Sequence, residues 1–215
     1  MKALAQFVMG GRYRALLVAV ASSGSVLFCW IGAAVAALVT LRQGPATGGG
    51  VVLWASLPAL VLVQVTGDTT PLALLLGTFV LALVLRLSVS LALAVLASAA
   101  VGIVTGLATY AFAGAMLEQL AEVFGQMLQQ LRQASGDGAD VALPVPTQLQ
   151  LAGMMGAANA MLAVLCLILG RYWQAALFNP GGFGEEFRAL RLPVGVTAGL
   201  LLGAAALLGL GLEYR

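Results

Sequence analysis

The sequence predicts an all-α fold, a polytopic transmembrane helical bundle of about seven apolar helices. Of the 215 residues, 61% are hydrophobic and only 8% are charged, whereas soluble domains carry about 25% charged residues. The apolar residues form runs that match the ~20 residues with which an α-helix crosses about 30 Å of hydrocarbon. The two-residue alternation of a transmembrane β-strand is absent from the sequence. We therefore expect a single membrane domain over residues 1–215, surrounded by the lipid bilayer, and no nucleic-acid partner.

Seven apolar segments succeed one another along the chain. They cover residues 5–21, 25–41, 49–65, 71–85, 87–113, 149–175 and 193–211. Between the later segments we expect an amphipathic helix over 114–133, an irregular loop over 134–148 and a cytoplasmic connector with one short helix over 177–192. The loop contains Gly136-Asp137-Gly138, a turn-forming sequence.

The first two segments are separated only by Ser22 to Ser25, so this stretch crosses the membrane either twice, as a hairpin, or once. Lys and Arg near span ends prefer the cytoplasmic side. A single crossing divides the ten basic residues evenly, whereas a hairpin leaves only Arg132 and Arg215 outside. We therefore predict a hairpin, a cytoplasmic N-terminus and a place in the bacterial inner membrane. The cytoplasmic basic residues are then Lys2, Arg12, Arg14, Arg42, Arg86, Arg171, Arg188 and Arg191.

The N-terminus allows a second interpretation, a cleaved signal peptide. Basic residues precede an apolar stretch that ends in Ala19-Val20-Ala21, the small-residue pattern of a cleavage site. The residues after this pattern form another apolar run, 26–41, and not the polar start of a secreted domain. Retention as a helical hairpin fits this arrangement better.

Residues 114–133 have the pattern of an amphipathic helix. Met116, Leu120, Phe124, Met127 and Leu131 recur at helical spacing, and Glu and Gln residues occupy the remaining face. This pattern predicts a helix on the membrane surface or over the outer mouth of the bundle. The alternative is a solvated extension of the preceding span.

The connector over 177–192 begins with a turn and continues into a short helix that presents Phe183 and Phe187 on one face. Such a helix could dock a partner, with Arg188 and Arg191 orienting the two rings. It could equally be an interfacial connector that buries its phenylalanines in lipid.

Several of these residues carry a family resemblance. The sequences Arg171-Tyr172-Trp173-Gln174-Ala175, Asn179-Pro180-Gly181-Gly182-Phe183, Glu186-Phe187 and Leu190-Arg191-Leu192 resemble the corresponding stretch of the YybS-like bacterial membrane proteins. The Gly67-Asp68-Thr69-Thr70-Pro71 turn before an arginine-ended helix is similar too. The resemblance implies an architecture like that of the substrate-binding S components of energy-coupling-factor transporters, small bundles that hold a ligand near the outer face.

Polar uncharged residues inside the spans are the candidate ligand-binding groups. Thr105, Thr109 and Asn159 could line a small cavity between facing helices and offer hydrogen bonds in an apolar pocket. The alternative is that each bonds across a helix interface, worth about 0.6 kcal/mol on average.

Glycines at four-residue spacing predict faces where helix backbones approach closely. One pair is Gly102 and Gly106, and a second set is Gly195, Gly199 and Gly203. These faces pack either within the chain, which we favour, or against a membrane protein partner or a second copy.

Enzymatic signatures are missing from the sequence. The chain has no histidine, so neither a Ser-His-Asp set nor a zinc-binding H-E-x-x-H motif is present. Cys29 and Cys166 lie within apolar runs and are interpreted as buried apolar residues. We expect no catalytic residues, no metal and no cofactor. Two functions remain: a small-molecule-binding or transport-associated subunit, and a scaffold that binds other membrane proteins.

Overall fold

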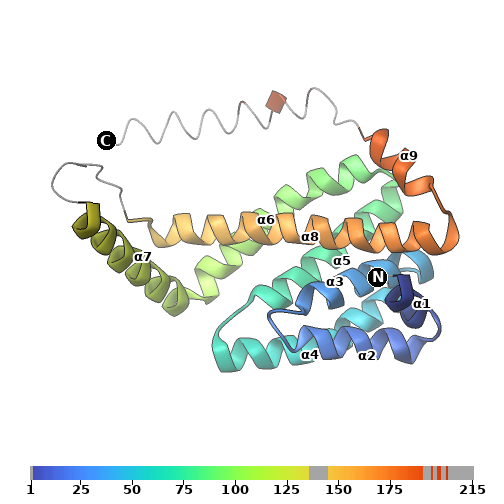
Figure 1. Cartoon of the computed structure of the whole chain (residues 1–215), viewed down its shortest axis with the longest axis horizontal. Helices are drawn as coiled ribbons and strands as arrows, with labels where there is room; N and C mark the ends of the chain where they lie inside the picture. The colour runs from blue at the N-terminus through green and yellow to red at the C-terminus, as the bar shows by residue number, and fades with distance from the viewer. Residues whose placement is uncertain (1, 136–144, 191–194, 196–197, 200–201, 203–215) are drawn as a thin grey trace.

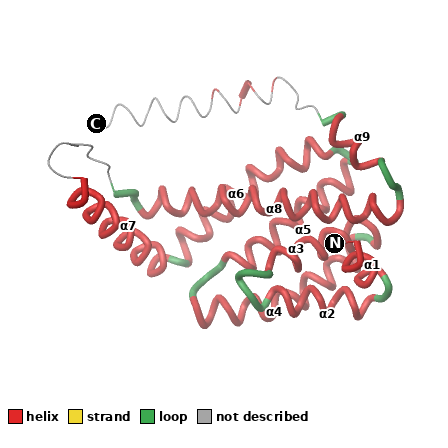
Figure 2. Tube along the Cα trace, in the orientation of Figure 1, coloured by secondary structure: helices red, strands yellow, loops and turns green. Residues whose placement is uncertain are grey.

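The computed structural model is all-helical over the residues it describes, which are 2–135, 145–190, 195, 198–199 and 202. Figure 2 shows helices joined by short loops, with no strand in the described part of the chain. The described helices are α1 (Lys2–Met9), α2 (Arg12–Ser23), α3 (Cys29–Gln43), α4 (Pro45–Thr66), α5 (Thr70–Ser88), α6 (Leu91–Phe112), α7 (Gly114–Ser135), α8 (Gln148–Phe178) and α9 (Gly182–Arg188).

The first apolar segment, predicted as one span over 5–21, is two helices. Gly10 and Gly11 separate α1 from α2, and Gly11 is the extended residue before α2. Ala5 and Val8 of α1 are fully buried, and α1 packs against α2, α3 and α8. The Gly10-Gly11 pair followed by Arg12 and Arg14 is itself a turn signal, and the prediction of a single span over 5–21 overlooked it.

Helices α2 and α3 form an antiparallel pair where two membrane crossings were predicted. An added Cβ at Gly32 of α3 would lie 3.1 Å from the carbonyl oxygen of Ala19 in α2, so the two backbones are in close contact. Ser23 Oγ at the end of α2 donates to the carbonyl oxygen of Ala55, midway along α4. Every residue from Ala33 to Val39 is at most 1% exposed, which makes α3 the central helix of the bundle.

Among the described residues, four helices are long and apolar enough to cross a membrane, and they indicate a membrane protein. They are α4, α5, α6 and α8. The prediction of about seven spans is not confirmed. Two apolar segments form α2 and α3, of 12 and 15 residues, which are shorter than the ~20 residues that a full crossing needs. The segment 193–211 lies almost wholly outside the described residues.

Helix boundaries differ from the predicted ones where turns and close contacts decide them. Helix α4 begins at Pro45, four residues before the predicted start, because Pro is favoured in a first helical turn and Gly48 packs on Thr40. The predicted span 87–113 begins instead at Leu91, after a break in which Val89 has a φ of 52°. Ser90 caps α6 by accepting a hydrogen bond from the Leu93 amide.

Helices α3, α5 and α8 run in the same direction and end together. Cys166 Sγ lies 3.5 Å from the carbonyl oxygen of Trp30, and Gln174 Nε2 donates to the carbonyl oxygen of Leu41. Arg86 near the end of α5 donates to that same oxygen at 2.6 Å. We call the end of the bundle that carries Arg42, Arg86 and Arg171 the arginine end; in Figure 1 it lies at the right, near α1 and α9.

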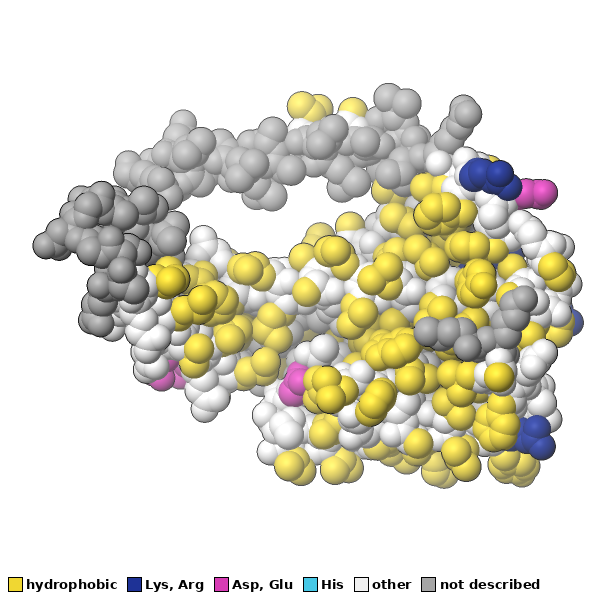
Figure 3. All heavy atoms as spheres, in the orientation of Figure 1, with side chains coloured by type: hydrophobic (Ala, Val, Ile, Leu, Met, Phe, Trp, Pro, Cys, Tyr) yellow, Lys and Arg dark blue, Asp and Glu magenta, His cyan; other side chains and the backbone are white. Residues whose placement is uncertain are grey.

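The opposite end carries the turn between α4 and α5, the start of α8, and α7 (Figure 1). Gly67, with φ 74°, ends α4 in the left-handed conformation, and the Asp68 carboxylate accepts a hydrogen bond from the Thr70 amide at 2.8 Å. Acidic side chains lie toward this end and basic ones toward the arginine end in Figure 3, although α9 also brings an acid there.

Helix α7 packs against the start of α8. The face that makes this contact is rotated about the helix axis relative to the predicted apolar face. Leu117 is fully buried and forms a small cluster with Leu151 and Ala152, against which Leu120 and Phe124 pack. Met127 and Leu131 of the predicted stripe are about half exposed. The contact with α8, which the helical period alone does not fix, decides the orientation of α7. The predicted loop 134–148 begins within α7 and otherwise lies largely outside the described residues.

Candidate functional site

A small cavity lies between α5, α6 and α8, and Thr105, Thr109 and Asn159 all line it. Its volume is about 160 Å³. Asn159 Nδ2 donates to Thr105 Oγ1 across the α6–α8 interface at 3.3 Å. Thr109 lies one turn farther along α6 and is 3% exposed. The structure therefore brings the three residues together on one cavity, and the hydrogen bond expected in the alternative interpretation is present as well.

The start of α5 forms the third wall of this cavity. Thr69, Thr70 and Ala73 contribute to it, so the cavity lies toward the opposite end from the arginines. Gly77, one turn deeper on α5, allows the close approach of Val101 of α6, because an added Cβ there would lie 2.8 Å from Val101 Cγ1; Asn159 Nδ2 would lie at an ordinary contact distance of 3.7 Å. No pattern in the sequence indicated that α5 would face Asn159.

The Asn159 amide is only partly satisfied. The residue is 6% exposed, and its Oδ1 has no hydrogen-bond partner among the described residues. A buried amide oxygen without a partner costs roughly 1–3 kcal/mol in protein interiors. The hydroxyl of Thr109 also has no hydrogen bond within the described part of the chain. The cavity therefore offers hydrogen-bonding groups that the described protein itself does not fully use.

A larger apolar groove continues from the cavity between α5 and α6. Its volume is about 580 Å³. Leu72, Leu76 and Val80 line it from α5, and Ala97, Ala100 and Val104 line it from α6. Leu76, Val80 and Val104 are 45–66% exposed, so the groove opens on the outer surface of the helices.

The predicted glycine pair on α6 makes close backbone contact with α8. An added Cβ at Gly102 would lie 3.1 Å from the carbonyl oxygen of Gly156, and one at Gly106 would lie 3.1 Å from that of Ala152. Gly156 is the tightest of these positions, since its Cβ would overlap the Gly102 carbonyl oxygen and lie 2.9 Å from Gly106 Cα. Gly156 has no glycine four residues away on either side, so spacing alone did not identify it.

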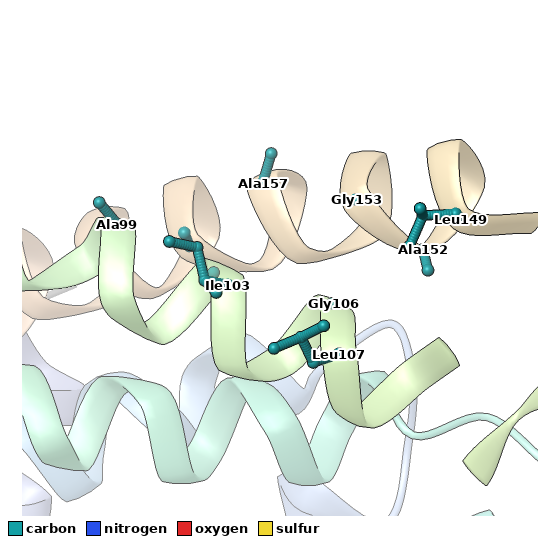
Figure 4. Close-up of a pocket in the computed structure, with 10 residues that line it drawn as sticks. Ala99, Ile103, Gly106, Leu107, Leu149, Ala152, Gly153 and Ala157 are labelled. Carbon is teal, nitrogen blue, oxygen red and sulfur yellow. The ribbon is translucent and has the colours of Figure 1, made fainter. Parts of the chain in front are cut away.

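Figure 4 shows a pocket along this same contact, lined by Ala99, Ile103, Gly106 and Leu107 of α6 and by Leu149, Ala152, Gly153 and Ala157 of α8. These residues form an apolar hollow of about 440 Å³. Among the described residues, no polar side chain lines the hollow, so they provide close packing and no group for recognising a polar ligand.

The second predicted glycine set is described only in part. Added Cβ atoms at Gly195 and Gly199 would meet nothing within 4 Å, and Gly203 lies outside the described residues. Close packing at these three glycines stays a prediction.

The residues predicted to dock a partner lie on and after α9. Phe183 stacks edge-on against Tyr172 of α8, with ring centroids 5.9 Å apart, and Phe187 lies beside it and is 52% exposed. Arg188 Nε donates to the carbonyl oxygen of Gly184 in its own helix. Arg191 lies outside the described residues. One phenylalanine therefore holds α9 on α8, and the other remains accessible.

The ion pair between Arg171 and Glu186 attaches α9 to α8. Arg171 Nη2 and Glu186 Oε2 are 2.7 Å apart, and both side chains are about one quarter exposed. Sequence inspection missed this pair, because residues on different helices can be paired only once the turn at 179–181 is known.

Within the described ranges, no group of three or more His, Cys, Asp or Glu side chains is arranged to hold a metal ion. Cys29 and Cys166 are free and buried. Comparisons with protein-family models, with curated proteins and with solved structures gave no match for this chain.

Proposed function

We propose that this chain is a multi-pass protein of the bacterial inner membrane that binds a small molecule in the cavity between α5, α6 and α8, as a binding or transport-associated subunit. One observation carries the proposal. Asn159 lines the cavity, and its Oδ1 atom is buried without a hydrogen-bond partner among the described residues. Unsatisfied polar groups within a membrane are costly, and a ligand with a hydrogen-bond donor would supply the missing partner.

Charge supports an orientation with the arginine end in the cytoplasm. Arg42, Arg86 and Arg171 lie at that end, and basic residues near span ends prefer the cytoplasmic side. The pair α2 and α3 begins and ends at the arginine end. This orientation therefore does not depend on how deep the turn between the two helices lies in the bilayer. In this orientation the cavity lies in the outer half of the membrane. The resemblance to YybS-like proteins, and through it to S components, agrees with such a cavity and remains part of the proposal.

Reporter fusions test the orientation. Fusions after residues 44 and 182 should report the cytoplasm, because both positions lie at the arginine end, and a fusion at residue 138 should report the outer compartment. An external signal at 44 would contradict the hairpin topology.

A pair of variants tests binding. Asn159→Leu removes the amide at similar volume, and Thr78→Val removes another buried polar group, a hydroxyl that does not line the cavity. We expect organic extracts of the purified protein, analysed by mass spectrometry, to contain a small molecule that the unmodified protein and Thr78→Val retain. Asn159→Leu should lose it. Identical extracts from all three proteins would overturn the proposal.

The accessible ring of Phe187 favours one alternative function, a scaffold that binds another membrane protein. Exchange of Phe183 and Phe187 for Trp keeps the preference for the membrane interface but changes shape. Weaker recovery of a partner with unchanged membrane insertion is the result that this alternative requires.

A further inference from the structure

The cavity at Asn159 and the groove between α5 and α6 are adjacent and share part of their lining. Four residues line both: Thr69, Ala73, Thr105 and Thr109. Polar groups are confined to the part that Asn159 closes, and beyond Thr105 the wall is apolar. A molecule that fills the whole space therefore needs a small polar head and an apolar chain.

The groove is open to the surroundings of the helices along its length. The exposed side chains of Leu76, Val80 and Val104 border it. These residues belong to helices long and apolar enough to span a membrane, so in a bilayer the groove faces hydrocarbon. An apolar chain can enter there sideways from the bilayer without passing through water.

The chemistry of the lining selects an uncharged head. Among the described residues, no charged side chain lines the cavity or the groove. Asp68 is the nearest acid along the chain, and its carboxylate accepts a hydrogen bond from the Thr70 amide at the start of α5. A charged head would be buried without a counter-ion, which is far more costly than burying a hydroxyl that forms hydrogen bonds. A hydroxyl can donate to Asn159 Oδ1 and accept from Thr109.

Resting on the proposed binding function, we propose that the ligand is a neutral lipid-like amphiphile with a hydroxyl head in the Asn159 cavity and a single alkyl chain in the α5–α6 groove. From Thr69 to Val80 the groove extends roughly 16 Å along α5, at 1.5 Å per residue. This length suits an extended chain of medium length such as a dodecyl group.

Photolabelling tests this assignment. The full chain is reconstituted in phosphatidylcholine nanodiscs with dodecanol that carries a photoreactive diazirine in its chain, and labelled peptides are identified by mass spectrometry. We expect labels on 72–80 and 97–108. Unlabelled dodecanol should compete at least tenfold better than dodecanoate or dodecylamine, whose heads are charged, and better than hexanol, whose chain is too short.

Two pairs of variants make the result specific. Ala100→Leu fills the groove without touching the cavity, and Ala111→Leu makes the same change at an exposed position of α6 that lines neither space. Labelling should fall at least fivefold in Ala100→Leu and stay unchanged in Ala111→Leu. Asn159→Leu should reduce the labelling by a similar factor. Thr78→Val should leave the labelling unchanged.

Equal competition by charged and neutral heads, or equal labelling of the two alanine variants, would overturn the assignment to a neutral amphiphile. A molecule retained by the unmodified protein and lost from Asn159→Leu would still support the proposed binding function in that case. Extracts that do not differ between these proteins would instead overturn the binding function itself.

Discussion

The two ends of the bundle are held together in different ways. At the arginine end, Arg86 and Gln174 donate to the carbonyl oxygen of Leu41 at the end of α3, and Arg42 lies 4.1 Å above the ring of Phe178. Toward the opposite end, α6 and α8 meet through the backbones of Gly102, Gly106 and Gly156.

The comparison shows that the arginine end is closed by long side chains, whereas the close packing of small residues toward the opposite end leaves a cavity. Long side chains close the arginine end, because a helix C-terminus leaves carbonyl oxygens that cations can satisfy. Small residues bring two backbones together toward the other end but leave space where α5 faces them, and the cavity lies there. Four substitutions test this comparison.

Gly156→Ala should have the largest effect. Its Cβ would overlap the Gly102 carbonyl oxygen, so α6 and α8 must separate, at a cost of about 2–3 kcal/mol in free energy of unfolding. SDS titration in mixed micelles measures this change.

Gly153→Ala is the matched control, because its Cβ would meet nothing within 4 Å. It should be neutral or stabilising by up to about 1 kcal/mol, the helix preference of alanine over glycine. Equal losses at both positions would show that the glycine contact does not hold the two helices.

Arg86→Met should lower the free energy of unfolding by about 1–2 kcal/mol. The partly buried guanidinium would no longer donate hydrogen bonds to the carbonyl oxygens of Thr40 and Leu41. The same titration measures it. Arg12→Met, at an exposed arginine with no described partner, should leave stability unchanged. No difference between the two would mean that Arg86 does not fasten α3 to α5.

Glu186→Gln should cost at most about 1 kcal/mol, since its ion pair with Arg171 is partly exposed. Its visible effect is local: amide hydrogen exchange across 182–188 should become faster, because α9 is held less firmly on α8. Glu185→Gln changes the same charge at a neighbouring acid without a described ion pair. Unchanged exchange in Glu186→Gln, or equal acceleration in both variants, contradicts this role.

Glu118→Ala should have the smallest effect, within about 0.5 kcal/mol. Its one described contact, with Gln148 at 3.4 Å, is long and exposed. A loss as large as that of Arg86→Met would show that polar contacts hold both ends alike.

The sequence by itself determined the class of the protein and much of its helix pattern. Composition and run length are enough to predict apolar helices, because an α-helix satisfies its own backbone and needs only about 20 apolar residues to cross a bilayer. Charge favoured a turn between the first two apolar segments, and α2 and α3 are an antiparallel pair. Polarity alone raised a cavity at Thr105, Thr109 and Asn159 as one of two interpretations and did not decide between them.

Only the tertiary structure decided which apolar residues face other helices and which face outward. In an apolar surrounding, hydrophobicity does not distinguish the two faces of a helix, so Leu38 at 0% exposure and Val104 at 66% look alike in the sequence. The position of Gly156 and the third wall of the cavity from α5 could not be predicted for the same reason. Each depends on which helix lies opposite, and that is settled by the fit of small residues between neighbouring backbones.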